Sequence, residues 1–386
     1  MTSPSKSFAF AECCKILDFA TPAQHSQNDY KSIKNTNIMS GQVLVSEQDI
    51  INTYSKDEQF SCKKYFEYKK LVKENPKYGY KRCAKLLGVP QGRTRWWHTK
   101  GKKNAIPLAL KAVQKLKDAK LLPFTENHKD VKIIFNMLGI LFGDGGVDKR
   151  LNTVAFISSD KRDIDLWQSD FEKIFSFAKN KIQIIEGGEY GHSYNIRCWD
   201  RAVIRFFVAL GVPVGDKVAT KYTLPNYIFD ISRKKRIAFL DGLFAAEIGV
   251  PRFRGDPRWS WTKRFTDFSF GMSKIDALEE EHKFFLNSIK KLSKTVGLTT
   301  TPNLRKELCK PTRRKDGNIS YCYRIFFQTH YEKVLKFNEQ FNLRYALDKK
   351  ERLEKQVKLA KEHKDIKNSE FYKKIKRQKR AFRKRN

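Results

Sequence analysis

The chain has 386 residues, of which 40% are hydrophobic and 13% aromatic, so it can bury a large core and is not wholly disordered. Its 78 Lys and Arg against 42 Asp and Glu leave a formal charge of +36, far more than solubility requires, which favours a polyanionic partner. Nucleic acid is favoured over a membrane, because no stretch approaches the roughly 20 apolar residues that a membrane span needs. We therefore expect an intracellular protein associated with nucleic acid.

The seven cysteines form no C-x-x-C motif and lie near no paired histidines. Their spacing predicts neither a zinc site nor a disulfide framework. We expect reduced thiols at Cys13, Cys14, Cys62, Cys83, Cys198, Cys309 and Cys322.

The N-terminal part of the chain divides into a leader and a helical region. Residues 1–55 are rich in Ser, Asn, Gln and Lys without a sustained period, which predicts a disordered leader. Residues 57–123 have helical periodicity, and we expect a small helical domain there.

Two short helices around a Gly-Val turn in 78–103 give the outline of a helix-turn-helix. Leu86, Val89 and Trp96 are expected to form the core shared by the two helices. The start of the second helix would contact DNA through Gln91, Arg93, Thr94 and Arg95. A basic helical hairpin that only packs on its neighbour is the alternative.

Residues 131–347 contain the same order of elements twice, in 131–230 and in 231–347. Each half fits a series of helix, two strands, helix, two strands and helix, so the predicted fold class is α+β. Apolar helices at 133–143 and 234–246 begin the two halves, and an acid follows each of them at the same place, Asp144 and Glu247.

Small residues four apart mark one face of each apolar helix, Gly139 and Gly143 in the first and Gly242 and Ala246 in the second. Packing on these faces would bring the two acids side by side, at helix ends that already carry partial negative charge. A divalent cation resolves this conflict, and oxygen ligands favour Mg²⁺, with Mn²⁺ as the alternative. The implied chemistry is phosphodiester hydrolysis. The opposing interpretation is that each acid only ends a buried helix at the solvent.

The segments "MLGILFGDG" and "LDGLFAAEI" resemble the signature of the LAGLIDADG homing endonucleases, and the resemblance covers about 131–345. It implies two pseudo-symmetric αββαββα halves with a saddle of two antiparallel sheets over DNA. It also implies that Asp144 and Glu247 bind catalytic Mg²⁺. Ile248 departs from the pattern, because the family usually has glycine there.

The family's basic residue that assists the attacking water has no certain match. The candidates are Lys161, Arg197 and Lys274.

Strand alternation predicts which side chains read DNA bases. Polar side chains with suitable donors and acceptors occur at Gln183, Asn195, Arg197, Arg305 and Arg324. The alternative for each is an ordinary solvated polar residue.

Two basic segments lie beside these strands or beyond them. Residues 252–264 form an extra loop that would clamp a phosphate backbone, with a merely solvated loop as the alternative. Residues 348–386 form a basic tail, expected to be helical or to fold on DNA, with a solvated charge run as the alternative.

Together these features predict a monomeric, Mg²⁺-dependent, site-specific DNA endonuclease of a mobile genetic element such as an intron. Its partner is double-stranded DNA, and no membrane is involved. The alternative is a binding protein on the same scaffold, either a maturase of intron RNA or a DNA-binding regulator without cleavage.

Overall fold

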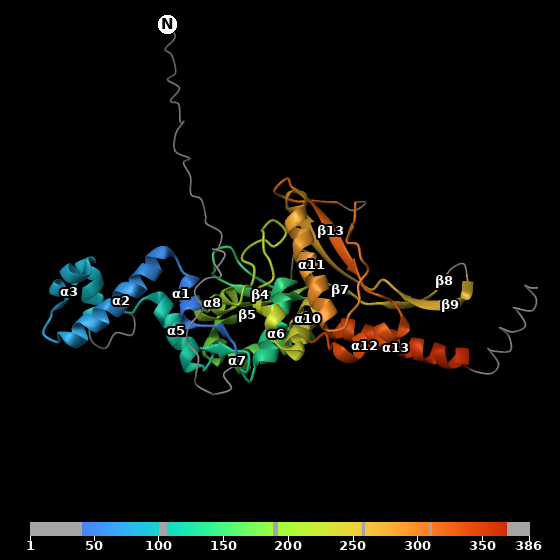
Figure 1. Ribbon diagram of the computed structural model, residues 1–386, viewed down its shortest axis with the longest axis horizontal. Helices are drawn as coiled ribbons and strands as arrows, with labels where there is room; N and C mark the ends of the chain where they lie inside the picture. Colours follow the sequence, from blue (N-terminus) through green and yellow to red (C-terminus); the bar gives the residue numbers. More distant parts are fainter. Residues whose placement is uncertain (1–40, 100–105, 188–191, 257–258, 309–310, 369–386) are drawn as a thin grey trace, which may run out of the picture. The chain divides into compact units, whose positions relative to one another are not determined.

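The computed structural model describes residues 41–99, 106–187, 192–256, 259–308 and 311–368, and these residues belong to one unit (Figure 1). The first part of the expected leader lies outside the described residues. For its last part the prediction of disorder is wrong, because this segment forms β1 (Val43–Val45) and α1 (Glu47–Asn52). Ser46 caps α1 in a capping box, and Val45 and Ile50 are fully buried.

The helices α3 (Tyr80–Leu87) and α4 (Gln91–His98) are joined by a tight turn at Gly88, whose φ of +63° favours glycine. Together with α2 (Lys56–Glu74) they enclose a small core of Tyr68, Cys83, Leu87 and Val89. Of the predicted core residues only Val89 belongs to this cluster. Leu86 and Trp96 are 58% and 59% exposed, because the inward faces of the helices carry Leu87 and Trp97 instead.

Helix α5 (Leu108–Asp118) belongs with the residues that follow it rather than with α3 and α4. Its apolar face, including Ala112 and Leu116, joins the main core. Lys115 forms an ion pair of 2.7 Å with the buried Asp200, and β2 (Phe124–Thr125) pairs with β1. The expected helical domain therefore does not have one core of its own.

Two similar halves make up the rest of the structure. The first contains α6 (Val131–Phe142), β3 (Gly146–Val147), β4 (Val154–Ser158), α7 (Lys161–Ile174), η2 (Ser176–Lys181), β5 (Ile182–Glu186), β6 (Tyr194–Cys198) and α8 (Arg201–Ala209). The second follows α9 (Tyr227–Asp230) and contains α10 (Arg233–Glu247), β7 (Ile248–Gly249), β10 (Ser269–Ile275), η3 (Asp276–Leu278), α11 (Glu279–Thr295), β11 (Arg305–Lys306), β12 (Thr312–Arg313), β13 (Ile319–Phe326) and α12 (Tyr331–Gln340).

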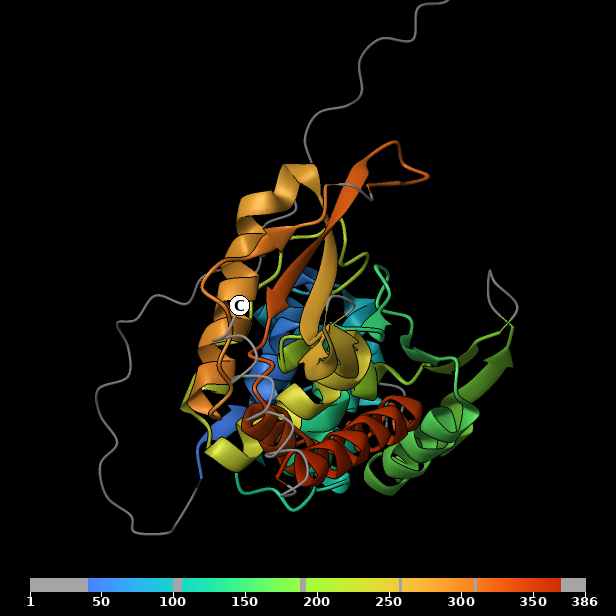
Figure 2. The same ribbon diagram turned by 90° about the vertical axis from the view of Figure 1, so that its right-hand side faces the viewer.

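The two sheets have the same antiparallel order, β3-β4-β6-β5 and β7-β10-β13-β11. Helix α11 lies along one face of the second sheet (Figure 1, Figure 2), and α7 packs on β4 and β6 of the first. These observations confirm the predicted α+β class and the series αββαββα in each half.

A hairpin and a long helix have no counterpart in the first half. A hairpin of β8 (Arg252–Asp256) and β9 (Trp259–Thr266) forms where an extra loop was predicted. Helix α13 (Leu347–Asn368) buries Leu353, Val357 and Ala360, so the basic tail begins as a packed helix. The remainder of the tail, 369–386, lies outside the described residues.

The helices α6 and α10 meet at glycines. A Cβ atom on Gly139 would collide with the backbone of Phe239 and Leu243, and one on Gly242 would collide with the backbone of Asn136. This close contact explains why α6 is apolar along most of its length, since protein surrounds it. Within the described ranges, no helix combines the length and apolar character that a membrane span requires.

Replacing Gly242 by alanine should therefore destabilise the protein. A methyl group at this position meets backbone atoms that cannot rotate away, so we expect a loss of roughly 1–3 kcal/mol or more in the free energy of unfolding. Urea denaturation of Gly242→Ala measures it. Gly92→Ala in α4 is the control: its Cβ meets nothing within 4 Å, and alanine there should stabilise by about 0.5–1 kcal/mol. Equal stability of the two variants would contradict the described helix contact.

Candidate active site

The two predicted acids lie where the central helices end. Helix α6 ends at Phe142, shortly before Asp144, and α10 ends with Glu247. Gly143 lies against Ala246, and a Cβ atom on it would be 3.1 Å from Cγ of Glu247. Asp144 is exposed and Glu247 is half-buried. The small residues predicted at the interface thus lie in contact, and they bring the two acids together.

The residue after each acid has a different role in the two halves. A Cβ atom on Gly145 would lie 2.8 Å from the carbonyl oxygen of Ala155, so this position has no room for a side chain. Ile248 has an extended backbone with φ of −82°, pairs with Phe270 in the sheet and is 3% exposed. Its side chain packs in the core, so the departure from glycine leaves Glu247 at the end of α10.

The carboxylates interact with each other without a neutralising hydrogen bond. Burial and then the charge of Asp144 raise the pKa of Glu247 to about 7. Loss of hydration also raises the pKa of Asp144, although its side chain reaches the surface. Among the described residues, neither carboxylate accepts a hydrogen bond or has a cation within 4 Å, so their shared negative charge is open to a ligand.

Two lysines that the sequence analysis did not identify flank the acids. The amino group of Lys217 donates to the carbonyl oxygens of Leu141 (3.4 Å), Gly143 and Gly145 at the end of α6. Burial lowers its pKa to about 8, against the opposing effect of both acids.

Lys349 occupies the corresponding position in the second half. Its amino group donates to the carbonyl oxygens of Ala245 (2.8 Å) and Ala246 at the end of α10, and burial lowers its pKa. Each lysine follows an aspartate shortly after the last helix of its half, α8 or α12. This repeated Asp-Lys pair is the signal that could have revealed them.

The three candidate basic residues lie elsewhere. Lys161 is exposed at the first turn of α7, and Arg197 is exposed on β6. Lys274 is buried, and its amino group donates to the carbonyl oxygens of Lys217 (2.7 Å) and Thr220 (2.5 Å). Lys274 therefore holds the segment that carries Lys217, while Lys217 itself is next to the acids.

The donor set suits a hard divalent cation. The described residues contain no group of three or more His, Cys, Asp or Glu side chains that could hold a metal, so the two carboxylates are the core of any site here. Mg²⁺ is commonly bound by one or two carboxylates together with water and substrate phosphates. The two carboxylates that lack hydrogen bonds fit this requirement and would hold such an ion.

The residues predicted to contact DNA bases differ in their exposure to solvent and in their hydrogen bonds. Gln183 and Arg197 are exposed cross-strand partners on β5 and β6. Asn195 is half-buried, and its buried Oδ1 accepts no hydrogen bond from a described group. In the second sheet, Arg305 is exposed opposite Arg324.

Arg324 is the most restrained of these residues. It is half-buried, and its Nε lies 2.7 Å from Oε1 of Glu307. This ion pair occupies part of the donor surface that was predicted to reach a base.

The residues predicted to read DNA from α4 do not all point outward. Gln91 and Arg95 are exposed and Arg93 is half-buried. Thr94 has no exposed surface, and its hydroxyl lies 3.1 Å from the carbonyl oxygen of Tyr80 and 3.0 Å from that of Gln91. Thr94 is therefore removed from the set, because its position in the helix faces α3.

Comparison with known sequences shows partial matches to archaeal proteins. The chain is 26% identical over 235 residues to DNA-directed RNA polymerase subunit Rpo1N of Methanocaldococcus jannaschii, covering 58% of this chain and 17% of that protein. It is 29% identical over 256 residues to the tRNA-splicing ligase RtcB of the same organism, covering 62% and 24%. The chain thus spans at most about a quarter of these relatives. No protein-family model matches it.

Comparison with solved structures gives distant matches. The homing endonuclease I-DmoI in complex with DNA and Mn is 19% identical, with a TM-score of 0.32, over 55% of this chain and 96% of that chain. The N-terminal LAGLIDADG domain of DUF199/WhiA is 11% identical, with a TM-score of 0.29, over 59% and 88%.

The raised pKa of Glu247 predicts that the ionised acid pair lowers the free energy of unfolding at high pH. A carboxyl whose pKa rises on folding contributes stability at low pH, and this contribution is lost as the pH rises from about 4.5 to about 7. Glu247→Gln cannot ionise, so it should be more stable than the wild type by roughly 1–3 kcal/mol at pH 8 and differ little at pH 4.5. Urea denaturation at both pH values tests this; a pH-independent difference would show that ionisation is not the cause.

Proposed function

We propose that the protein is a site-specific DNA endonuclease that hydrolyses both strands of a duplex with Mg²⁺ or Mn²⁺. The observation that carries this proposal is the pair of carboxylates without hydrogen bonds, Asp144 and Glu247. They lie at the ends of two pseudo-symmetric helices, with a lysine beside each. Two similar halves around one acid pair suit a substrate with two similar strands.

Each group has a distinct task in this proposal. Asp144 and Glu247 hold the cation, which when bound lowers the pKa of a water molecule and stabilises charge on the phosphate. Lys217 and Lys349 anchor the helix ends and place positive charge next to the backbone phosphates. With a pKa of about 8, the amino group of Lys217 can also exchange a proton near neutral pH.

The pattern of relatives supports a mobile origin. A polymerase subunit and an RNA ligase have different activities, yet both match this chain over a minor part of their own length. Similarity to a minor part of proteins with such different activities suits a module that moves between genes. We propose that this module is a homing endonuclease of an intron or a related mobile element.

DNA contact is proposed for both the sheets and the helical region. The helix-turn-helix formed by α3 and α4 would extend recognition beyond the saddle, and the protein would act as a monomer because it contains both halves. The proposed DNA-contacting residues are Gln91, Arg93, Arg95, Gln183, Asn195, Arg197, Arg305 and Arg324.

The test uses DNA in which the host sequences that flank the reading frame are joined without it. We expect double-strand cleavage with Mg²⁺ and none with EDTA. Asp144→Asn and Glu247→Gln should each reduce the rate by roughly a thousandfold or more, because each removes several kcal/mol of cation-mediated stabilisation. Gel electrophoresis of the products measures the rate.

Two outcomes would reject the proposal. Tight binding without cleavage at any Mg²⁺ or Mn²⁺ concentration would indicate a DNA-binding regulator. Stimulated splicing of the intron RNA, without cleavage of DNA, would indicate a maturase.

Substitution of Lys217 or Lys349 should slow cleavage less than substitution of either acid. Lys217→Met and Lys349→Met keep the length of the side chain and remove its charge and its hydrogen bonds to the helix ends. We expect cleavage to fall by about 10–100-fold, as for other groups that orient metal ligands. Single-turnover cleavage measures the effect. Lys161→Met is the matched control and should cleave at the wild-type rate, whereas an equal loss would remove the assignment to Lys217 and Lys349.

A further inference from the structure

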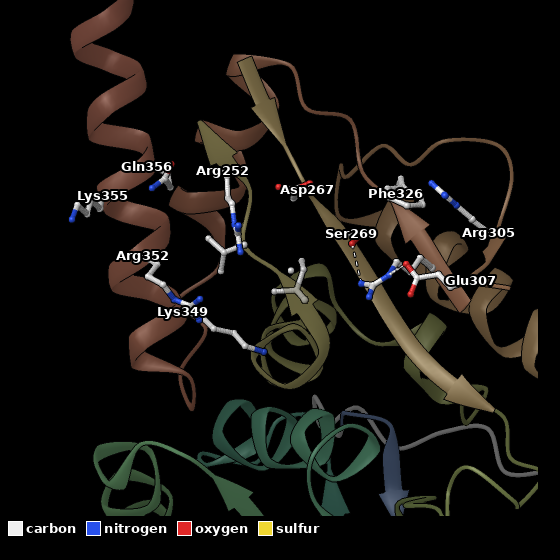
Figure 3. Close-up of a pocket in the computed structure, with 14 residues that line it drawn as sticks. Arg252, Asp267, Ser269, Arg305, Glu307, Phe326, Lys349, Arg352, Lys355 and Gln356 are labelled. Carbon is white, nitrogen blue, oxygen red and sulfur yellow. Dashed lines mark hydrogen bonds and ion pairs between the residues drawn. The ribbon is translucent and has the colours of Figure 1, made fainter. Parts of the chain in front are cut away.

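A groove of about 1070 Å³ lies between α13 and the second sheet, and its lining includes Ile248, the residue after Glu247. Figure 3 shows Arg352 on α13 and Arg252 on β8 extending into this space, with Ser269 and Arg305 on the opposite side. The sheet contributes the face that carries Ser269 and Arg324, while Phe270 and Ile325 point into the core. Helix α13 therefore forms a second wall along the face of the sheet that is proposed to bind DNA.

The groove is strongly cationic. Its lining includes Arg252, Arg305, Arg324, Lys349, Arg352 and Lys355. The acids in the lining are Asp267 and Glu307, and Glu307 is paired with Arg324. Arg352 pairs with the exposed Asp348 outside the groove at 2.8 Å, a surface contact that contributes little. Among the described residues, Arg252 and Arg305 have no acid within 4 Å.

The neighbouring hollow on the side of the first half has the opposite charge. It encloses about 290 Å³, and its lining contains the acids Asp144, Asp160, Asp163 and Asp348 but only two cations, Lys349 and Arg352. The groove of the second half is therefore the more cationic of the two and the better site for a phosphate backbone.

The wall formed by α13 is held at its N-terminal end and near its middle. The backbone N–H of Leu347 donates to Asp163 at 2.9 Å, and Glu351 pairs with Arg162 of α7 at 2.6 Å. Further along, the side chain of Gln356 accepts a hydrogen bond of 2.7 Å from the backbone of Phe253 on β8. These contacts hold α13 in a defined position beside the sheet, so the groove between them has a defined shape.

We infer that this groove binds the phosphate backbone of one DNA strand, so that α13 and β8 add phosphate contacts to the second half that the first half lacks. The inference rests on the proposed DNA endonuclease function. It adds that the two halves contact the DNA backbone to different extents. Guanidinium groups on two facing walls can each bind phosphate oxygens in a bidentate manner. The second half should thus contribute more salt-dependent affinity than the first.

The test measures how the affinity for a duplex DNA of unrelated sequence depends on salt, by fluorescence anisotropy. Each phosphate contact contributes about −0.9 to the slope of log affinity against log salt concentration. The double variant Arg252→Gln, Arg352→Gln should therefore lower the magnitude of the slope by about 2. The matched control is Lys358→Gln, Lys361→Gln, which removes two exposed charges of the same helix that do not line the groove.

The control should keep the wild-type slope, and Arg252→Lys, Arg352→Lys should keep most of it because the charges remain. An equal fall in the groove variant and the control, or no fall in either, would overturn the inference while leaving the proposed function intact. Failure of the wild-type protein to bind any duplex would overturn both.

Discussion

The backbones of α6 and α10 touch at Gly139 and Gly242, and the candidate site depends on this contact. Any side chain larger than hydrogen at either position would meet backbone atoms of the other helix. Two helices that pack this closely must also end close together, so Asp144 and Glu247 become neighbours. The acid pair is therefore a consequence of backbone packing, and the apolar faces of the two helices supply the energy that maintains it.

The same packing creates an electrostatic conflict, which the protein resolves only in part. Helix ends carry partial negative charge, and each receives a lysine that binds its carbonyl oxygens. Because Lys217 and Lys349 are occupied by these carbonyls, they do not form ion pairs with the carboxylates. Burial and then the charge of Asp144 raise the pKa of Glu247, and the pair of carboxylates is suited to a divalent cation.

Similar halves do not make the molecule symmetric. The two sheets share one strand order, yet only the second half carries the hairpin of β8 and β9 and the long helix α13. Cations from these additions face the second sheet, whereas acids such as Asp160 and Asp163 gather beside the first. A nearly repeated scaffold can thus present different charge to the two ends of a bound polyanion.

The sequence by itself determined the order of elements in each half, the contact faces of α6 and α10, and the position of both acids. These features follow from local periodicity and from small residues at fixed spacing. Only the tertiary structure decided that Lys217 and Lys349 join the acids, that Thr94 is buried, and that α13 forms a wall of the groove. Each of these depends on contacts between residues far apart in the chain, or on the rotation of a short helix, which local pattern does not specify.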